Sequence, residues 1–288
     1  MLDLSPDVIR DVVARALAED VGAGDLTTLA AVPAEARAEA AFVFREAGVV
    51  CGLPVARAGF AAADPGLTLE ARVEEGARVE RGAVVATVAG PARGLLTGER
   101  VALNLLQRMS GVATLAARYV EAVAGTGARI LDTRKTTPGL RALEKYAVRV
   151  GGATNHRYGL YDGVMLKDNH LAILAAQGLG LAEAIGRARA AVGPMVAVEV
   201  EVESVEQAAA AAAAGADMIL LDNMPPAQLR AAVAAVAGRA RTEASGGITL
   251  ETIRAVAEAG VDFISVGALT HSARALDIGL DIGVPTQA

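Results

Sequence analysis

The spacing of strand-like segments in the second half of the chain limits the folds that it can adopt. From residue 128 onward, apolar runs typical of strands alternate with helical patterns; the expected strands lie near 128–132, 163–166, 196–202, 217–221, 240–244 and 262–266. The last four start 21, 23 and 22 residues apart. Such regular repeats are typical of βα units, which build parallel sheets. Six strands are fewer than the eight of a closed barrel, so an incomplete α/β barrel and an open doubly wound sheet both stay possible, and we favour the barrel.

The first half of the chain predicts a separate, mixed α/β layer. Ser5 and Pro6 are a helix start, and apolar residues recur with helical period up to Glu19. Thr97 is expected to cap a long helix that leads into the second half. Strand-like runs and one further helix are expected between these helices: strands at 38–46, 48–52, 66–73 and 82–90, and the helix near 53–63.

Composition and charge exclude several classes of function. The 288 residues carry a formal net charge of −6, which argues against broad binding to nucleic acid or to an anionic membrane. No apolar run is long and uncharged enough to span a bilayer. The single cysteine, Cys51, cannot form an internal disulfide, and the N-terminal residues lack the pattern of a signal peptide. We therefore expect a cytoplasmic protein with no nucleic-acid or membrane partner.

Positive charge gathers in one window of this acidic chain. Residues 129–167 have a net charge of +5, whereas the remainder has −11, and the three lysines of the chain, Lys135, Lys145 and Lys167, all lie in this window. The run "LDTRKTTPG" at 131–139 places Arg134 beside Lys135 directly after an expected strand. Arginine forks bind carboxylates in a bidentate manner, and lysines add point charges. The window predicts a local site for a substrate with several anionic groups, with His156 and Arg157 as further candidates.

Acidic residues occur in and after the neighbouring expected strands. Glu199 and Glu201 alternate with valines and so share one face of a strand, while Asp222 ends the next strand. Glu201 and Asp222 can therefore hold Mg²⁺ or the hydroxyl groups of a sugar. For Glu199, an outward orientation or a pair with a barrel arginine is the alternative.

Glycine-rich turns follow the last two expected strands, in "SGGI" and "SVGAL". Glycine lets backbone N–H groups approach an anion, and the loops after the last strands of α/β barrels often bind phosphate. The predicted phosphate-binding residues are Ser245, Gly246, Gly247, Val266, Gly267 and Ala268.

Motifs along nearly the whole chain resemble those of the quinolinate phosphoribosyltransferase family. They are, in order, "EDVGAGDLTT", "ERVALNLLQRMSGVAT", "LDTRKTTPGLRALEKYAVRVGGATNHRYGLYDGVMLKDNH", "VEVEVES", "LLDNM", "EASGGI" and "GVDFISVGALTHS". The resemblance implies an N-terminal α/β sandwich domain, residues 1–104 with 270–288, and an incomplete α/β barrel of about seven strands, residues 105–269. It also implies the Mg²⁺-dependent reaction of quinolinate with phosphoribosyl pyrophosphate, giving nicotinate mononucleotide, pyrophosphate and CO₂, a step of NAD synthesis.

The same resemblance implies roles for individual residues. Lys167, Glu201 and Asp222 are the catalytic candidates, and Glu201 and Asp222 match the acids that hold ribose and metal. Arg100 matches an arginine that enters the neighbouring subunit's site, which implies a homodimer. Gly247 departs from the pattern, because many family members have Asn there. The residues expected to bind quinolinate are Arg134, His156, Arg157 and Lys167, with Thr133 and Lys135 adjoining.

Other functions stay open from the sequence. A barrel lyase can use Lys167 as a Schiff-base amine, and a binding protein can keep the same pocket without turnover. Relatives encoded beside molybdenum-transport genes are poorly separated by motif spacing. The sequence does not assign Lys145 to the site or to its helix.

Overall fold

The computed structural model describes residues 4–283, and the chain divides into two compact units. The first unit takes the chain up to Ala117, Thr136–Gly152 and the chain from Leu269 onward. The second takes Arg118–Lys135 and Ala153–Ala268. Both units combine helices with a sheet, so the expected α/β class is confirmed. The two predicted domains, residues 1–104 with 270–288 and residues 105–269, are parts that would fold independently. Their boundaries stay a prediction.

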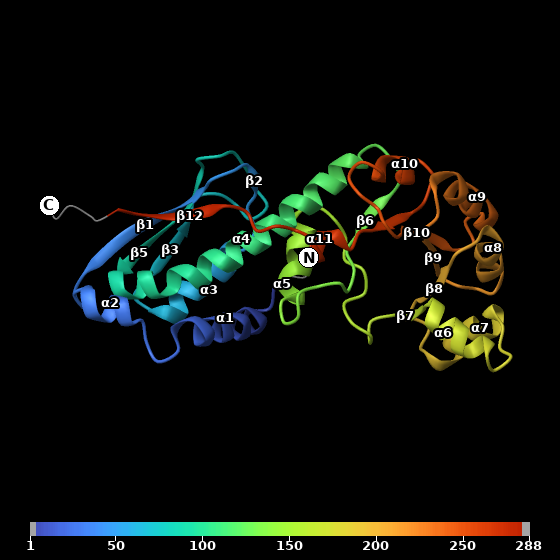
Figure 1. The fold of residues 1–288 in the computed structure, drawn as a ribbon, viewed down its shortest axis with the longest axis horizontal. Helices are drawn as coiled ribbons and strands as arrows, with labels where there is room; N and C mark the ends of the chain where they lie inside the picture. The colour runs from blue at the N-terminus through green and yellow to red at the C-terminus, as the bar shows by residue number, and fades with distance from the viewer. Residues whose placement is uncertain (1–3, 284–288) are drawn as a thin grey trace. The chain divides into compact units, whose positions relative to one another are not determined.

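A four-stranded antiparallel sheet in the order β12-β1-β5-β3 is the centre of the first unit. The C-terminal strand β12 pairs with β1, with Ile278 opposite Phe44, and Figure 1 shows the two side by side. The elements of the first half and the end of the chain are α1 (Pro6–Val21), α2 (Leu26–Ala31), β1 (Arg37–Phe44), β2 (Gly48–Val49), α3 (Leu53–Ala63), β3 (Thr68–Ala71), β4 (Arg78–Val79), β5 (Val84–Pro91), α4 (Ala92–Ala122), α5 (Arg141–Val150), α11 (Ala268–His271) and β12 (Ile278–Gly283).

Of the two N-cap residues predicted for helices, one is confirmed and the other is wrong. Ser5 caps α1 as predicted, because its hydroxyl accepts a hydrogen bond from the N–H of Asp7 at 3.3 Å. The predicted cap at Thr97 is wrong, since α4 already begins at Ala92, directly after β5. The Thr97 hydroxyl instead donates to Asp25 at 3.2 Å, and Asp25 is the residue that caps α2. Thr97 therefore links two helices from within the helix that it was expected to start.

Aromatic and aliphatic side chains form the core of the first unit between its sheet and helices. Phe42 on β1 meets Phe60 on α3 edge to face, with ring centroids 5.9 Å apart. Leu95 and Leu106 on α4 are fully buried in the same cluster. An aromatic pair of this geometry contributes about 0.5–1.5 kcal/mol beyond its buried area. The packing fixes α3 and the first turns of α4 against the sheet.

All six predicted strands of the second half form one parallel sheet in the order β6-β11-β10-β9-β8-β7. The first strand, β6, pairs with the last, β11, whereas a doubly wound sheet reverses its strand order in the middle. The arrangement is therefore an incomplete barrel. Its elements are β6 (Arg129–Leu131), β7 (Val164–Leu166), α6 (Asp168–Ala175), α7 (Leu181–Ala191), β8 (Val198–Val202), α8 (Val205–Ala213), β9 (Met218–Asp222), α9 (Pro226–Val236), β10 (Arg241–Ser245), α10 (Ile253–Ala257) and β11 (Phe263–Ser265).

The seam of the barrel lies between β6 and β7, which do not pair within the described residues. Thr154 forms a single parallel bridge with Leu131 at the free edge of β6. Its N–H donates to Ile130 O at 2.8 Å, and its carbonyl accepts from the Asp132 N–H at 3.1 Å. Thr154 thus occupies the position of the seventh strand that the family resemblance implied, although the sheet itself has six strands.

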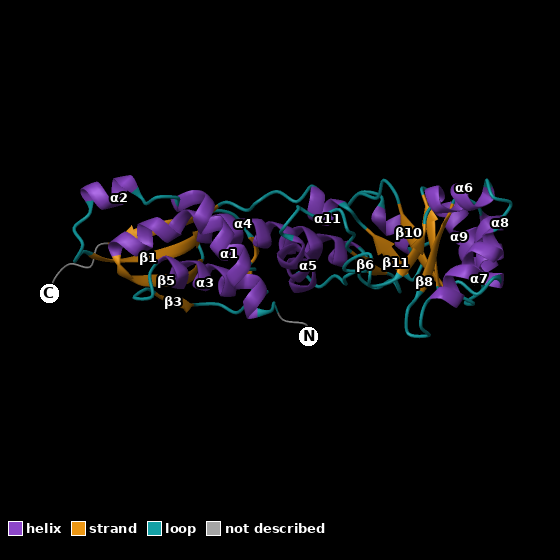
Figure 2. Ribbon diagram, turned by 90° about the horizontal axis from the view of Figure 1, so that it is seen from below, coloured by secondary structure: helices purple, strands orange, loops and turns teal. Residues whose placement is uncertain are grey.

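Strand alternation determines which side chains face the barrel interior. Val198, Val200 and Val202 are buried, while Glu199 and Glu201 point to the opposite face and line cavities. Figure 2 shows helices α6 to α9 on the outer side of the strands. The valines therefore pack beneath helices, and both glutamates face inward, so the outward alternative for Glu199 is wrong.

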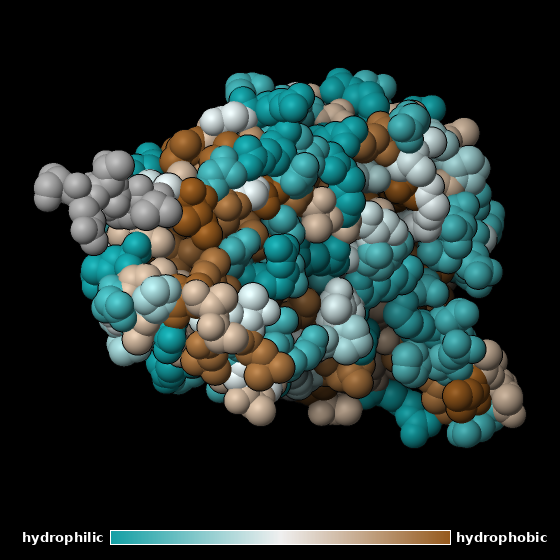
Figure 3. All heavy atoms as spheres, turned by 60° about the vertical axis from the view of Figure 1, so that its left-hand side comes forward, coloured by the Kyte–Doolittle hydropathy of each residue, from teal (hydrophilic) through white to brown (hydrophobic). Residues whose placement is uncertain are grey.

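Hydrophilic side chains predominate on the face of the molecule in Figure 3, and hydrophobic ones lie between them in several smaller groups. The large hydrophobic side chains with high exposure include Leu26 and Leu29 on α2, which are 82% and 55% exposed.

Among residues 4–283, none of the helices combines the length and apolarity that crossing a bilayer requires.

Candidate active site

A cavity of about 610 Å³ opens at the carboxyl ends of the barrel strands, within the second unit. The carboxyl ends of parallel strands are where α/β barrels place their active sites. Residues from all six strands or from the loops that follow them line this cavity: Thr133, Arg134, Lys135, His156, Arg157, Met165, Lys167, Glu201, Leu220, Asp222, Asn223, Glu243, Ser245, Gly246, Gly247 and Ser265.

Four cations, Arg134, Lys135, Arg157 and Lys167, line this cavity and are called the cationic wall here. The buried Nε of Arg134 has no hydrogen-bond partner among the described residues. Arg157 donates from Nη1 to the carbonyl of Gly163 at 3.0 Å. Burial lowers the pKa of Arg157, and the charge of Arg134 lowers it further. Two arginines that disfavour each other's charge in this way are suited to an anionic ligand that neutralises both.

Glu201 on β8 and Asp222 on β9, the acidic pair, line the same cavity from neighbouring strands. The ammonium of Lys167 lies 2.7 Å from Glu201 Oε2, so cation and acid meet directly. Burial raises the pKa of Asp222, and the charge of Glu201 raises it further, whereas the Asn223 amide and Lys167 oppose the rise. Two carboxylates with this mutual repulsion attract a further cation or hydroxyl donors.

Ser245, Gly246 and Gly247, the glycine loop, follow β10 at the edge of the cavity. Gly246 has φ +96°, and a Cβ there would lie 2.1 Å from Asn223 Oδ1. Gly247 has φ +61°, with no heavy atom within 4 Å of a Cβ placed on it. The loop therefore needs glycine at position 246 for space, while position 247 is open.

The predicted phosphate loop after β11 contributes less to the lining of the cavity than the glycine loop does. Ser265 lines the cavity, whereas Val266, Gly267 and Ala268 are not among its lining residues. The N–H of Val266 donates to Leu131 O at 3.0 Å and so belongs to the sheet. Phosphate binding by Val266, Gly267 and Ala268 stays a prediction, and the N–H of Val266 is already used within the sheet.

A buried pair of acids lies beneath His156. Glu199 is 4% exposed and Glu243 is fully buried; together they are called the carboxylate floor. His156 Nε2 lies 3.1 Å from Glu199 Oε2 and 3.3 Å from Glu243 Oε2. Burial lowers the pKa of His156, but the hydrogen bonds to Glu199 and Glu243 outweigh it and raise the pKa to about 10. Burial also raises the pKa of Glu199, against the His156 hydrogen bond that lowers it.

One contact opposes the protonation of His156. The N–H of Arg157 donates to His156 Nδ1 at 2.6 Å, which requires an unprotonated Nδ1. Two buried carboxylates facing Nε2 outweigh one neutral hydrogen bond at Nδ1, so the pKa of His156 is raised. Either way, the Nε2 edge of the ring is engaged by the carboxylate floor.

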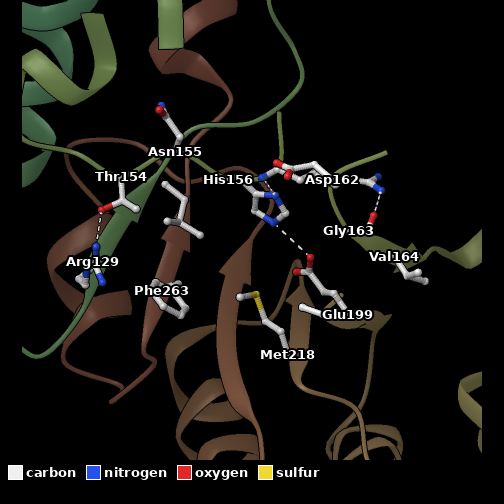
Figure 4. A pocket seen from close by; sticks show the side chains of 13 residues that line it. Arg129, Thr154, Asn155, His156, Asp162, Gly163, Val164, Glu199, Met218 and Phe263 are labelled. Carbon is white, nitrogen blue, oxygen red and sulfur yellow. Dashed lines mark hydrogen bonds and ion pairs between the residues drawn. The ribbon is translucent and has the colours of Figure 1, made fainter. Parts of the chain in front are cut away.

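A second cavity, of about 320 Å³, lies on the other side of the carboxylate floor, toward the amino ends of the strands. Arg129, Met218 and Phe263, each the first residue of its strand, line it together with Glu199 and His156. Figure 4 shows the imidazole of His156 directed at Glu199 across this space. His156 therefore lies between two cavities.

The structure brings most of the predicted site residues together. Thr133, the cationic wall, His156, the acidic pair and the glycine loop all line the larger cavity. Arg100 lies on α4 in the first unit, with its side chain 58% exposed, and Lys145 is buried on α5 in the same unit. Sequence analysis missed Met165, Leu220, Glu243 and Ser265. An acid within the strand "RTEAS", two residues before Ser245, was the available signal for Glu243.

Known proteins match this chain over nearly its whole length. Residues 25–110 match the model of the quinolinate phosphoribosyl transferase N-terminal domain, and residues 112–281 match that of the C-terminal domain. The nicotinate-nucleotide pyrophosphorylase [carboxylating] of Mycobacterium leprae is 48% identical over 97% of this chain and 99% of its own length. A quinolinate phosphoribosyltransferase [decarboxylating] of Nicotiana glauca is 41% identical over 95% of this chain and 82% of its own. The crystal structure of NadC from Streptococcus pyogenes has a TM-score of 0.93 at 44% identity, covering 98% of this chain and 99% of that one. The chain belongs to the quinolinate phosphoribosyltransferase family.

Proposed function

We propose that this chain transfers the phosphoribosyl group of phosphoribosyl pyrophosphate to quinolinate. The reaction gives nicotinate mononucleotide, pyrophosphate and CO₂, and it supplies NAD synthesis. The relatives named above carry the same activity in their names. A cytoplasmic location is part of the proposal and rests on the single, buried Cys51.

One observation carries the proposal: several cations and two acids line the same cavity at the strand ends. The cationic wall suits the two carboxylates of quinolinate, and the unpartnered Nε of Arg134 is a donor left for such a ligand. The acidic pair suits the hydroxyls of a ribose, and the glycine loop suits its 5-phosphate. A diacid and a sugar pyrophosphate can therefore bind next to each other.

The charges account for the first chemical step. The pyridine nitrogen forms a bond to C1 of the ribose while the bond from C1 to pyrophosphate breaks. Positive charge develops on the ribose ring in this transition state, and Glu201 and Asp222 stabilise it. Lys167, paired with Glu201, and the rest of the cationic wall offset the charge of the departing pyrophosphate and of the substrate carboxylates.

The loss of CO₂ follows from the product of that step. The alkylated pyridine nitrogen is cationic, so it accepts the electron pair released when the bond from C2 to its carboxylate breaks. C2 then takes up a proton. The cationic wall holds the second carboxylate and keeps the ring in place, and no organic cofactor is needed for this step.

Mg²⁺ is the cofactor of the proposal, and the donor set fits it. Glu201 and Asp222 are hard oxygen ligands on neighbouring strands. Burial and then the charge of Glu201 raise the pKa of Asp222. These two carboxylates would hold the ion. When bound, Mg²⁺ supplies charge neutralisation for a pyrophosphate.

The Schiff-base alternative is not favoured by the surroundings of Lys167. A Schiff-base nucleophile needs a neutral amine, whereas the nitrogen of Lys167 lies 2.7 Å from a Glu201 carboxylate oxygen.

A homodimer is part of the proposal, with Arg100 reaching the cavity of the partner protomer. Arg100 is well exposed on α4, and its Nη2 lies 3.9 Å from Glu99 Oε1, so only a loose ion pair holds it. The exposed Leu26 and Leu29 provide apolar surface in the same unit.

Mixing of variants tests the shared site. Arg100→Ala and Lys167→Ala proteins, each inactive alone, should regain roughly a quarter of wild-type activity when their protomers exchange, because one site of each heterodimer then has both residues. Lys167→Ala mixed with Glu201→Ala is the matched control, since both residues belong to one cavity. Equal activity in both mixtures would contradict the shared site.

The activity itself is tested by release of CO₂. Quinolinate labelled in its C2 carboxylate is incubated with phosphoribosyl pyrophosphate, Mg²⁺ and the protein, and labelled CO₂ is counted. Nicotinate replaces quinolinate in a parallel reaction that follows pyrophosphate release. Turnover of nicotinate without turnover of quinolinate would overturn the proposed substrate.

A further inference from the structure

The carboxylate floor takes no part in the reaction as proposed, yet it occupies the centre of the barrel. Glu199 lies two residues before Glu201 on β8, and Glu243 lies two residues before Ser245 on β10. Each acid therefore shares a strand face with a residue that lines the larger cavity, and it lies nearer the amino end of the strand. Burying two carboxylates at this depth costs free energy unless a cation or a hydrogen-bond donor pairs with them.

We infer that Glu199 and Glu243 are positioning residues that hold His156 from below and, through His156, fix where Arg157 meets a substrate carboxylate. The inference rests on the proposed function and assigns roles within the quinolinate-binding half of that site. His156 then acts chiefly through its neighbours. Glu243 reaches the lining of the larger cavity, but the inference assigns neither acid a contact with the substrate.

Packing alone does not fix the ring of His156. The cavity on its far side, about 320 Å³, leaves space next to the imidazole, as Figure 4 shows. Polar contacts must therefore set its orientation. The two Nε2 contacts to the carboxylate floor, at 3.1 and 3.3 Å, anchor one edge of the ring, and the Arg157 N–H meets the other at 2.6 Å.

The same contacts extend to Arg157. The backbone N–H of His156 donates to Asp132 Oδ1 at 2.8 Å, and the Asn155 amide donates to Asp132 Oδ2 at 2.6 Å. Residues 155–157 are thus tied to the barrel at Asp132 and at the carboxylate floor. If the floor is lost, one of these two anchors is lost, and the backbone of Arg157 is free to shift with the imidazole.

Charge adds a second reason for acids at this place. Arg134 and Arg157 repel each other, and the charge of Glu199 favours the charged form of Arg157. Buried anions beneath the cationic wall therefore let two arginines stay close before a substrate arrives. This preorganisation reduces the cost of gathering the cations during binding.

The experiment uses Glu199→Gln and Glu243→Gln, which keep size and remove charge. Dissociation constants for quinolinate and for phosphoribosyl pyrophosphate are measured separately by calorimetry, because a dissociation constant does not depend on the folded fraction of a sample. We expect the constant for quinolinate to rise roughly tenfold or more, with that for phosphoribosyl pyrophosphate within about twofold of wild type. Glu75→Gln is the matched control; Glu75 caps the N–H groups of Gly52 and Leu53 in the other unit.

A double-mutant cycle with His156→Ala tests whether the two acids act on quinolinate affinity through His156. If the floor acts through His156, Glu243→Gln should change quinolinate affinity little once the imidazole is gone. Equal losses in both backgrounds would overturn the inference, as would unchanged quinolinate affinity in both Gln variants. A wild-type protein that binds no quinolinate would instead refute the proposed function, so the two failures are distinct.

A metal ion is the competing explanation for the cluster. His156, Glu199 and Glu243 offer ligand atoms within 4.8 Å of one another. Glu199 Oε1 and both carboxylate oxygens of Glu243 are buried and accept no hydrogen bond from the described residues. Metal analysis of the purified protein decides between the two. One equivalent of a transition metal that Glu243→Gln abolishes would overturn the positioning role, whereas the absence of bound metal in wild type with weakened quinolinate binding in the variant supports it.

Discussion

Lys167 Nζ lies 2.7 Å from Glu201 Oε2, so the cationic wall and the acidic pair touch at one point of the cavity. Asp222 lies on the strand next to that of Glu201. Burial and the charge of Glu201 raise the pKa of Asp222, and the charge of Lys167 opposes this rise. A single ammonium thus balances two carboxylates. Any sugar pyrophosphate that binds here must share this cation with the acids.

Replacing Lys167 by Met should remove that balance. We expect kcat to fall by about 10²–10³, the usual effect of deleting one positioned group that stabilises transition-state charge. Arg241→Met is the control, because Arg241 forms an ion pair of similar length, 2.8 Å to Asp262, outside the cavity. Steady-state kinetics with both substrates measures the effect, and a kcat within about twofold of wild type would contradict the role of Lys167.

Arg134→Ala should weaken quinolinate binding by roughly 2–5 kcal/mol, the range for removing one partner of a buried charge pair. The buried, unpartnered Nε of Arg134 is the structural reason. Arg239→Ala is a suitable control, since Arg239 donates only to nearby backbone carbonyls of Ala235 and Val236 in the contacts described. Calorimetric titration with quinolinate measures the change, and unchanged affinity would refute the assignment.

The folding free energy should depend on pH through His156. Its pKa in the folded chain, about 10, lies above the ordinary value of 6.5, so the folded state binds the proton more tightly. That stabilisation is complete below pH 6.5 and is lost as pH rises toward 10, by at most about 1.4 kcal/mol per pH unit. Urea unfolding between pH 6 and pH 9 measures the slope. His156→Gln should flatten it, and an equal slope in the variant would place the titrating group elsewhere.

The two glycines of the glycine loop should respond differently to substitution. Gly246→Ala places a Cβ against Asn223, so we expect the loop to shift and the affinity for phosphoribosyl pyrophosphate to fall by roughly tenfold or more. Gly247→Asn should be tolerated, because its φ of +61° suits Asn and the space around it is open. Dissociation constants for phosphoribosyl pyrophosphate compare the two variants, and equal losses in both would contradict the distinction.

The sequence predicted the barrel well because its signal is local. Strand alternation and βα spacing can be read within about 20 residues, and all six strands are where they were expected. Glu201, Asp222, Lys167 and Ser245 were found by the same logic, since residues at the carboxyl ends of parallel strands must converge.

Features that depend on distant contacts could not be predicted in this way. An acid within a strand was the only local signal for Glu243, and the pairing of β10 with β9 and the position of His156 are needed to place it beneath the site. Thr97 is a residue type that commonly caps helices, but α4 begins at Ala92, directly after β5, so Thr97 lies inside the helix. His156 was expected to bind substrate directly, whereas its Nε2 edge faces two acids that lie 43 and 87 residues further along the chain.

The pairing of β12 with β1 has a practical consequence for handling this protein. Removing the last ten or so residues would strip the edge strand and leave the backbone groups of β1 open to any other extended chain, which invites aggregation. An affinity tag is better attached before α1 than after β12. Losses of yield on shortening the C-terminus should therefore be attributed to the exposed sheet edge before any defect in catalysis is considered.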